Sequence, residues 1–180
     1  MSKTKIGKMN QRLIVEKQDI VTRDLAGGFL DTWYPALNDV SDLAEANTTT
    51  TTIKIAGHGM TTGDYITNVT RDSVVREVTV ADVDTLTVSA VTAQVSGDTI
   101  TLHKYTTSKV WGHMKASTTA YVDEDQKRKI ISVLKLRTRY RTDFDKRYRF
   151  KLGTRTFQIL SFYNDEESNY YMYFELREVL

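Results

Sequence analysis

One stretch of the chain alternates between cations and uncharged residues: Leu134-Lys-Leu-Arg-Thr-Arg-Tyr-Arg141. A period of two residues is typical of a β-strand that buries one face and exposes the other. We therefore predict a strand whose exposed face carries a cationic ladder, defined as Lys135, Arg137, Arg139 and Arg141. Because like charges on one strand face repel each other, such a ladder indicates a negatively charged partner.

The cationic ladder lies in the most basic part of the chain. Residues 127–155 contain twelve Lys or Arg against two acids, a net charge of +10 in a chain whose total is +2. In one interpretation the ladder neutralises the phosphates of a nucleic acid without reading its sequence. In the other it is a solvated strand face that is balanced by the acids of residues 164–178. The sequence leaves both interpretations open.

Aromatic residues near the ladder bear on the kind of nucleic acid. Proteins that bind single strands place exposed rings among their cations. Tyr140, Tyr148 and Phe150 fall in the opposite, apolar phase from the ladder. We therefore expect a duplex or a protein partner rather than a single strand.

Composition excludes several classes of protein. The 180 residues are 40% hydrophobic and 27% charged, as in ordinary globular domains. No apolar run approaches the roughly 20 residues of a membrane-spanning helix, so we expect no membrane partner. Cysteine is absent, which excludes disulfides, thiolate nucleophiles and sulfur-ligated metals. The basic N-terminus is not followed by the apolar core of a signal peptide, so we expect no secretion.

A region rich in Thr, Val, Asp and Gly separates two more basic flanks. Turn signals within it divide short candidate strands at 52–56, 64–70, 74–80, 85–90 and 99–105. Candidate strands in the flanks lie at 12–22, 29–37, 109–115, 135–141, 147–152, 155–163 and 170–179. We predict an all-β fold with two domains: a small, discontinuous β-barrel from residues 1–41 and 108–180, and an inserted β-barrel-like module from residues 42–107.

Two further features of the basic flank carry predictions. Residues 116–129 are polar with little to bury, so they predict one long loop or short exposed helix. The last candidate strand has rings on both faces, which is typical of a central strand or of a subunit interface. We assign Tyr171 and Tyr173 to a subunit interface.

No set of residues in the sequence converges on a chemical reaction. His58, His103 and His113 are scattered and lack carboxylates at metal-ligand spacing. The glycines of residues 57–63 match neither a dinucleotide fingerprint nor a phosphate loop. The acids of residues 123–125 are adjacent, so their side chains diverge. We expect no enzyme activity, no catalytic residue, no metal and no cofactor.

The flanking segments resemble a known family in the order and spacing of several motifs. These are Met9-Asn-Gln-Arg-Leu-Ile-Val15, Arg23-Asp-Leu-Ala-Gly-Gly28 with Asp31-Thr-Trp33, Val110-Trp-Gly-His-Met-Lys115, Leu136-Arg-Thr-Arg-Tyr-Arg141, and residues 147–160 with their Gly153 hairpin. Together they look like the head-tail joining proteins of tailed bacteriophages, also called head closure or stopper proteins.

The resemblance implies a structural virion protein of the phage neck. In that family a small β-barrel assembles as a twelvefold ring below the portal and adaptor protein, continues the DNA channel and retains packaged double-stranded DNA without sequence specificity. A tail terminator or tail completion protein docks below. The implied location is the virion, and the host cytoplasm during assembly. The cationic ladder would then face DNA or a neighbouring subunit.

The resemblance also implies a channel-gating loop. A long loop of the family follows the strand that matches residues 110–115, projects inward and closes the channel. It carries over onto Ser117, Thr118, Thr119, Tyr121, Asp123, Glu124, Asp125, Gln126, Lys127, Arg128 and Lys129.

The inserted module departs from the family pattern. Residues 53–66 and 83–88 are similar to a small β-barrel module of ubiquitin-activating enzymes and of phage structural proteins. We expect it to decorate the outer rim of the ring. The alternative function is a soluble β-barrel protein that binds duplex nucleic acid as a monomer or dimer. A carbohydrate-binding tail decoration is a third option, which depends on the insert alone.

Overall fold

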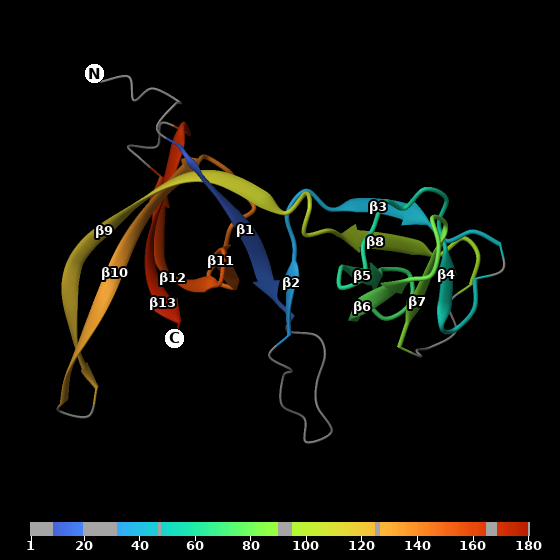
Figure 1. Ribbon diagram of the computed structural model, residues 1–180, viewed down its shortest axis with the longest axis horizontal. Helices are drawn as coiled ribbons and strands as arrows, with labels where there is room; N and C mark the ends of the chain where they lie inside the picture. The colour runs from blue at the N-terminus through green and yellow to red at the C-terminus, as the bar shows by residue number, and fades with distance from the viewer. Residues whose placement is uncertain are drawn as a thin grey trace. The chain divides into compact units, whose positions relative to one another are not determined.

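The computed structural model describes residues 9–19, 32–46, 48–89, 95–124, 127–164 and 169–179, with side chains of residues 116–132 excepted. Every regular element in these ranges is a β-strand (Figure 1), which confirms the predicted all-β fold. A search of the same residues for a helix able to cross a membrane finds none.

The chain divides into two compact units, which we describe separately. The sheet unit consists of residues 1–15 and 109–180, and the barrel unit of residues 16–108. The predicted domain boundaries differ from this division in residues 16–41, which lie with the inserted strands. The reason is that the second half of the first strand pairs with residues 33–35 and not with the basic flank.

The sheet unit is a curled antiparallel sheet. Its strands are β1 (Gln11–Gln18), β9 (Lys109–Glu124), β10 (Lys127–Arg139), β11 (Tyr148–Leu152), β12 (Arg155–Asn164) and β13 (Tyr171–Val179). They follow the order β11-β12-β13-β10-β9-β1, and β11 also pairs with β1. Beyond β1 the sheet continues into β2 (Trp33–Pro35), which belongs to the barrel unit.

A cluster of phenylalanines fills the inside of the curled sheet. Phe174 on β13 is 1% exposed, with its ring centroid 5.1 Å from that of Phe150 and 5.2 Å from that of Phe144. Such edge-to-face pairs add to the stabilisation from burying apolar area. The core also contains Leu13, Val15, Leu136, Phe157 and Leu176.

The strand β10 has the alternation predicted for the ladder. Leu136 and Thr138 are buried, whereas Lys135 and Arg139 are exposed. β10 ends at Arg139, so the prediction that Arg141 shares this strand face is wrong.

Gly112 marks the point where β9 changes partners. Its last paired residue on β10 is Thr138, and from there to residue 109 β9 pairs with β1. A Cβ at Gly112 would lie 2.6 Å from Leu136 Cδ1 and 3.0 Å from Leu13 Cδ1. Glycine therefore allows the strand to cross directly over the packed leucines.

β9 and β10 form a long hairpin where the sequence predicts a loop or short helix. Residues 116–124 pair with residues 127–134 of β10. This corrects the expectation for residues 116–129. The backbone groups of a hairpin pair across its two strands, and its Thr, Val and Ile residues favour extended structure.

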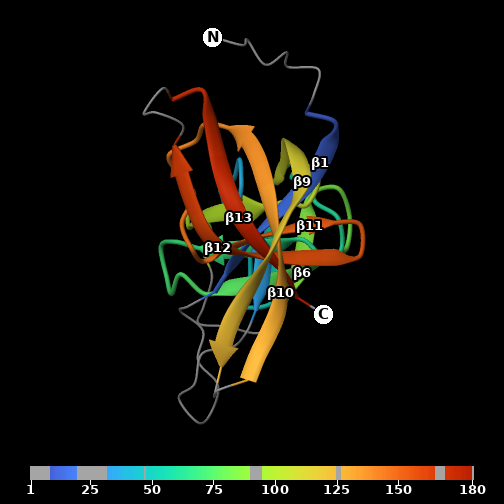
Figure 2. The ribbon, with the colours of Figure 1, turned by 90° about the vertical axis from the view of Figure 1, so that its left-hand side faces the viewer.

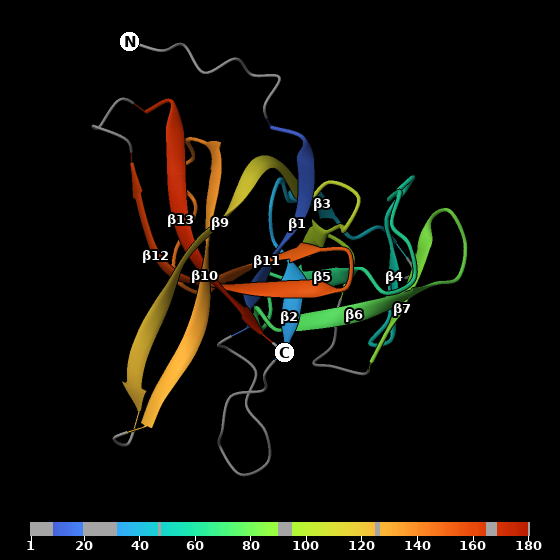
Figure 3. The same ribbon diagram turned by 60° about the vertical axis from the view of Figure 1, so that its left-hand side comes forward.

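The far part of this hairpin has no other strand beside it. β13 pairs with β10 only over residues 133–139, and β1 pairs with β9 only over residues 109–112. We call residues 116–124 and 127–132 the hairpin extension. Figures 1 and 3 show it running beyond the other strands of the sheet unit. Within the described residues, both of its edges are therefore unpaired.

The barrel unit is a closed, antiparallel six-stranded barrel, as the sequence predicts for the insert. Its strands are β3 (Val40–Leu43), β4 (Thr52–Lys54), β5 (Tyr65–Asn68), β6 (Val75–Val80), β7 (Thr85–Val88) and β8 (Thr99–His103). They follow the order β3-β8-β5-β6-β7-β4. The Glu45 N–H donates to the Lys54 carbonyl at 2.8 Å, which links the end of β3 to β4.

The barrel core is aliphatic. It contains Ala44, Ile53, Ile55, Met60, Ile66, Val78, Leu86, Val88, Ile100 and Leu102. The two ends of the unit's chain meet, because the Tyr105 hydroxyl donates to Glu16 Oε1 at 3.2 Å. An insertion with adjacent ends can interrupt another fold between two strands without disturbing it.

Candidate functional site

The ladder strand β10 lies between β9 and β13 (Figure 2), and the strand register sets which residues share its outer face. Arg137 lies opposite His113 on β9 and opposite Tyr173 on β13. In an antiparallel sheet, directly opposite side chains point to the same side. We call the resulting surface the basic–aromatic face: His113, Lys115, Lys135, Arg137, Arg139, Tyr163, Tyr171, Tyr173 and Glu175, with Trp111 at its edge, two residues along β9 from His113, where β9 pairs with β1.

The rings of this face contact its cations and one another. The guanidinium of Arg137 lies 5.1 Å from the centroid of the Tyr171 ring. The Tyr173 ring stacks on that of Tyr163 at 5.4 Å with an interplanar angle of 9°. Trp111 is 56% exposed and Tyr163 is 49% exposed, so large ring surfaces remain open to a ligand.

Tyr171 and Tyr173, which the sequence assigns to a subunit interface, lie on this face, whereas Trp111, His113 and Tyr163 were not predicted as site residues because the ladder is visible along one strand only. Tyr140, Tyr148 and Phe150 do not lie on the basic–aromatic face, as predicted, and Tyr148 and Phe150 are buried. The exposed rings come from neighbouring strands. The antiparallel pairing of residues 109–115 and 171–179 with the ladder strand was the signal that could have found them.

The acids nearest to the ladder do not neutralise it. Glu175 lies opposite Lys135, but its carboxylate accepts a hydrogen bond from the Ser161 hydroxyl at 2.8 Å. Glu178 instead forms an ion pair with Arg155 at 2.6 Å. Within the described residues, no ion pair involves the cations Lys135, Arg137 and Arg139. The interpretation of the ladder as a balanced, solvated face therefore finds no support among these residues.

Two buried nitrogens of the face also have unused hydrogen-bonding capacity. The Nε of Arg137 and the Nδ1 of His113 have no hydrogen-bond partner among the described residues. Lys115 lies opposite Lys135, a like-charge pair that destabilises the sheet. The face as a whole therefore favours an anionic ligand.

Arg141 is held apart from the other ladder residues. Its guanidinium forms a bidentate ion pair with Asp143, with Nη2 to Oδ2 at 2.6 Å and Nε to Oδ1 at 2.9 Å. The hydrogen bond to Asp143 raises the pKa of Arg141 above its ordinary value. Its charge is thus largely compensated within the chain.

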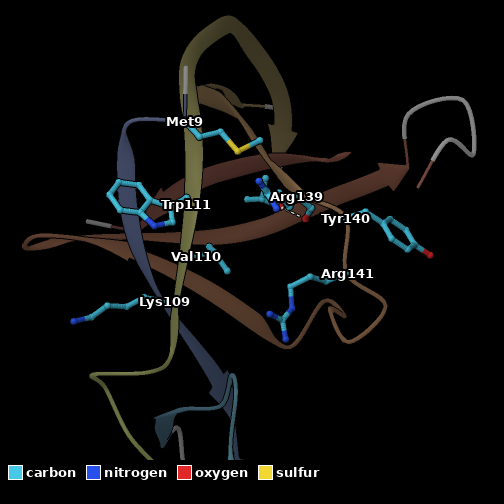
Figure 4. A pocket seen from close by; sticks show the side chains of 8 residues that line it. Met9, Lys109, Val110, Trp111, Arg139, Tyr140 and Arg141 are labelled. Carbon is cyan, nitrogen blue, oxygen red and sulfur yellow. Dashed lines mark hydrogen bonds between the residues drawn. The ribbon is translucent and has the colours of Figure 1, made fainter. Parts of the chain in front are cut away.

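A hollow of about 570 Å³ continues the face where β9 leaves β10 (Figure 4). Lys109 and Trp111 project from β9, and Arg139 and Arg141 come from the end of β10 and the segment after it. The remaining lining residues are Met9, Val110, Thr138 and Tyr140. Since cations line both sides beside an exposed indole ring, the hollow suits a group that is anionic and flat.

The residues predicted to form a gating loop lie in the arms of the hairpin extension. Ser117, Thr118, Thr119, Tyr121, Asp123 and Glu124 are on β9, and Lys127, Arg128 and Lys129 are on β10, while Asp125 and Gln126 lie outside the described residues. The register places Lys127 opposite Glu124 and Arg128 opposite Asp123.

One row of residues in the barrel unit has the order of a catalytic triad. His103 Nε2 lies 2.9 Å from Thr67 Oγ1, and His103 Nδ1 lies 3.0 Å from Asp39 Oδ2. The second contact is close enough for an ion pair but lacks the direction of a hydrogen bond, so Asp39 does not orient the ring as a triad acid does. The Tyr34 ring packs against His103 at 4.8 Å. The row therefore ties residues 34–39 to the barrel.

The other histidine of the barrel unit is also structural. His58 Nδ1 accepts a hydrogen bond from the Met60 N–H at 3.0 Å, and Nε2 contacts the Asp82 carbonyl at 3.0 Å. Among the described residues, no three His, Asp or Glu side chains converge as metal ligands. The basic–aromatic face and its hollow are thus the strongest candidate for a functional site.

Comparison with protein-family models, with curated protein sequences and with solved structures finds no match for this chain. Its function is therefore argued from the residues and geometry given above.

Proposed function

We propose that this chain is a structural virion protein of the phage neck. As a head-tail connector, it forms a ring below the portal and adaptor protein, continues the DNA channel, retains packaged DNA and docks the tail. The resemblance of the flanking motifs to head closure proteins motivates the proposal. The observation that carries it is the hairpin extension, which follows the strand that matches residues 110–115.

The hairpin extension is an element that needs a partner. A two-stranded hairpin without a covering layer is marginally stable in water. Unpaired strand edges are also templates for pairing with another chain. Both edges of the extension are unpaired within the described residues. In a ring, the extensions of neighbouring copies converge on one axis, where their edges meet and obstruct the channel.

The net charge of the sheet unit supports the proposed role in a DNA channel. Residues 1–15 and 109–180 contain nineteen Lys or Arg against ten Asp or Glu, a net charge of +9. Cations that are not paired within the chain attract the phosphates of DNA without regard to sequence. They also attract acidic surfaces of neighbouring copies, which would make Tyr171 and Tyr173 part of a subunit contact.

The proposal is tested by imaging and by shortening the hairpin. Negative-stain microscopy of the chain mixed with portal-bearing capsids is expected to show a ring at the portal vertex. Replacing residues 120–131 with a two-glycine turn, which keeps the pairing of Thr119 with Ser132, should leave the ring in place and let packaged DNA escape. If the intact chain does not bind the portal vertex, the neck assignment is wrong.

A second candidate function is a soluble protein that binds duplex nucleic acid. Lys135, Arg137 and Arg139, which form no ion pair among the described residues, favour it, since they need no ring to bind phosphate. Tight, salt-dependent duplex binding by an isolated monomer, without any association with portal-bearing capsids, would select this function over the first.

A further inference from the structure

The outer face of the sheet unit places a column of cations between two columns of rings. Lys135, Arg137 and Arg139 project from β10. Trp111 and His113 project from β9 on one side, and Tyr171 and Tyr173 from β13 on the other. Because adjacent strands are about 4.8 Å apart, Arg137 lies one strand away from a ring on either side, while Arg139 lies beside Tyr171 and lines the hollow together with Trp111.

This alternation matches the two parts of a single-stranded nucleic acid. Unpaired bases stack on exposed aromatic side chains, and the phosphates between them contact neighbouring cations. Four-stranded sheets of some RNA-binding domains use their faces in this way. A duplex gains less from exposed rings, because its bases are already stacked on one another and only its phosphates reach a sheet.

The exposure and the contacts of the side chains on the face favour binding of an external ligand. Trp111 is 56% exposed although a large apolar ring is stabilised by burial. Lys135, Arg137 and Arg139 form no ion pair within the described residues. The planar guanidinium of Arg137 over Tyr171 can extend a base stack while its unpartnered Nε donates to a phosphate.

The hollow lengthens the same surface at the Trp111 end. Arg12 lies 6.0 Å from the centroid of the Trp111 indole, so a cation is already positioned over this ring. Lys109 and Arg139 line the hollow beside it. A strand that crosses the face therefore has a place for a further nucleotide.

We propose that the basic–aromatic face binds single-stranded nucleic acid, with bases on its rings and phosphates on its ladder cations. This differs from the expectation, drawn from the ladder strand alone, of a duplex or protein partner. It goes beyond the proposed neck function, since it needs neither a ring nor a capsid. Little sequence preference is expected, because every base has a face that can stack.

Fluorescence anisotropy of the full chain with a labelled oligothymidine of about twelve nucleotides tests the proposal. A duplex of equal length and inorganic polyphosphate, which has no bases, are the comparison ligands. The oligothymidine is expected to bind about tenfold more tightly than either one. It should also quench the emission of Trp111, recorded in a Trp33→Phe background.

Matched variants separate ring contacts from charge. Trp111→Ala should lower the affinity for oligothymidine roughly tenfold and leave polyphosphate binding unchanged. Arg139→Gln should weaken both ligands and lower the salt slope of oligothymidine binding by about 0.7. Tyr170→Ala removes a 73% exposed ring that is not part of the face, and Lys146→Gln removes an exposed cation from a turn. Both controls should bind oligothymidine like the unaltered chain.

Several results would overturn the inference. Equal binding of oligothymidine, duplex and polyphosphate would make the face a general polyanion surface, and no binding would leave it without a nucleic-acid ligand. Equal effects of Trp111→Ala and Tyr170→Ala would remove the role of the rings. Thermal unfolding of each variant checks that its fold is intact, and Arg139→Gln, which is exposed, remains informative if Trp111→Ala unfolds. Capsid binding by the unaltered chain tests the neck function separately.

Discussion

The two units of this chain use charge in opposite ways. The barrel unit has six Lys or Arg and thirteen Asp or Glu, a net charge of −7, against +9 for the sheet unit. In the barrel unit Arg71 and Arg76 are bound to Asp98 and Asp72. In the sheet unit Arg141 and Arg155 are paired with Asp143 and Glu178, but Lys135, Arg137 and Arg139 of β10 form no ion pair among the described residues. The arginines of the barrel unit stabilise its fold through internal ion pairs, whereas the sheet unit leaves Lys135, Arg137 and Arg139 able to bind a partner.

The cores of the two units also differ in the kind of side chain that fills them. The barrel core is entirely aliphatic and is supported by buried ion pairs and hydrogen bonds. The sheet unit instead depends on rings around Phe174. Where charged side chains point to solvent, the fold is stabilised mainly by apolar packing. Large aromatic side chains bury the most apolar area per residue.

The largest expected effect comes from the aromatic core. Phe174→Ala removes a 1% exposed ring that contacts three other phenylalanines, so we expect the sheet unit to lose about 3–5 kcal/mol of unfolding free energy. Urea unfolding followed by Trp111 emission measures this loss. A loss below about 1 kcal/mol would mean that the cluster is not the main support of the sheet.

A matched pair of arginine variants compares framework charge with available charge. Arg76 is 7% exposed and donates to both oxygens of Asp72, so Arg76→Gln should cost about 1.5–3 kcal/mol. Arg139→Gln should change stability by less than about 0.5 kcal/mol, because Arg139 is exposed and forms no ion pair in the part of the chain that the structure describes. Similar losses in urea unfolding would contradict the contrast between the units.

Acid should weaken the barrel unit more than the sheet unit. Burial would raise the pKa values of Asp72 and Asp98, but hydrogen bonds from Arg76 and from Arg71 and Asn68 outweigh it and hold both below 3.8. The backbone N–H of Asp84 lowers the pKa of Asp82 in the same way. Carboxylates with lowered pKa values stabilise the fold above their unfolded pKa, and this contribution is lost as the pH falls through the folded pKa.

The corresponding group of the sheet unit is Glu178, whose pKa the hydrogen bond from Arg155 lowers from 4.5. Its side chain is only partly buried, so screening by solvent keeps its effect on stability small. Each unit has one tryptophan, Trp33 or Trp111, which serves as its probe in single-tryptophan variants. On acidification below pH 4, the Trp33 signal should change first. The reverse order would contradict the assignment of framework charge to the barrel unit.

The smallest effect concerns the like-charge pair on the face. Lys115→Glu places an acid opposite Lys135, which should stabilise the sheet unit by about 0.2–1 kcal/mol. The gain should shrink as salt is added, because exposed charges are screened. A loss of stability in low salt would show that the two lysines do not repel each other.

The sequence predicts the strands of both units well where one side of each strand is buried. Period-two patterns at 74–80 and 99–105 correspond to β6 and β8, and the ladder corresponds to the end of β10. The strand β3 was not predicted because all four of its residues are exposed, so no alternation marks it. It forms through backbone pairing with β8 alone. A buried strand face produces an alternation of apolar and polar residues in the sequence, whereas backbone pairing of an exposed strand requires no such alternation.

The cations of the candidate site and two of its rings, Tyr171 and Tyr173, were predicted, but not that they share one face. The alternation of Lys135, Arg137 and Arg139 is visible along one strand. Its rings come from β9 and β13, which lie beside β10 only after the sheet has formed with a particular register. A register shifted by one residue would turn every ring to the opposite face. The site thus depends on long-range pairing that local patterns do not encode.

The contact between Glu16 and Tyr105 has a consequence for the order of folding. β1 pairs with β9 through residues such as Leu13 and Val110, which are distant in sequence. Closing so long a loop costs chain entropy and slows folding. When the barrel unit folds, Glu16 and Tyr105 are brought together at 3.2 Å, and only short segments then separate β1 from β9. Folding of the inserted barrel therefore lowers the chain entropy that is lost when β1 pairs with β9 and the sheet unit forms.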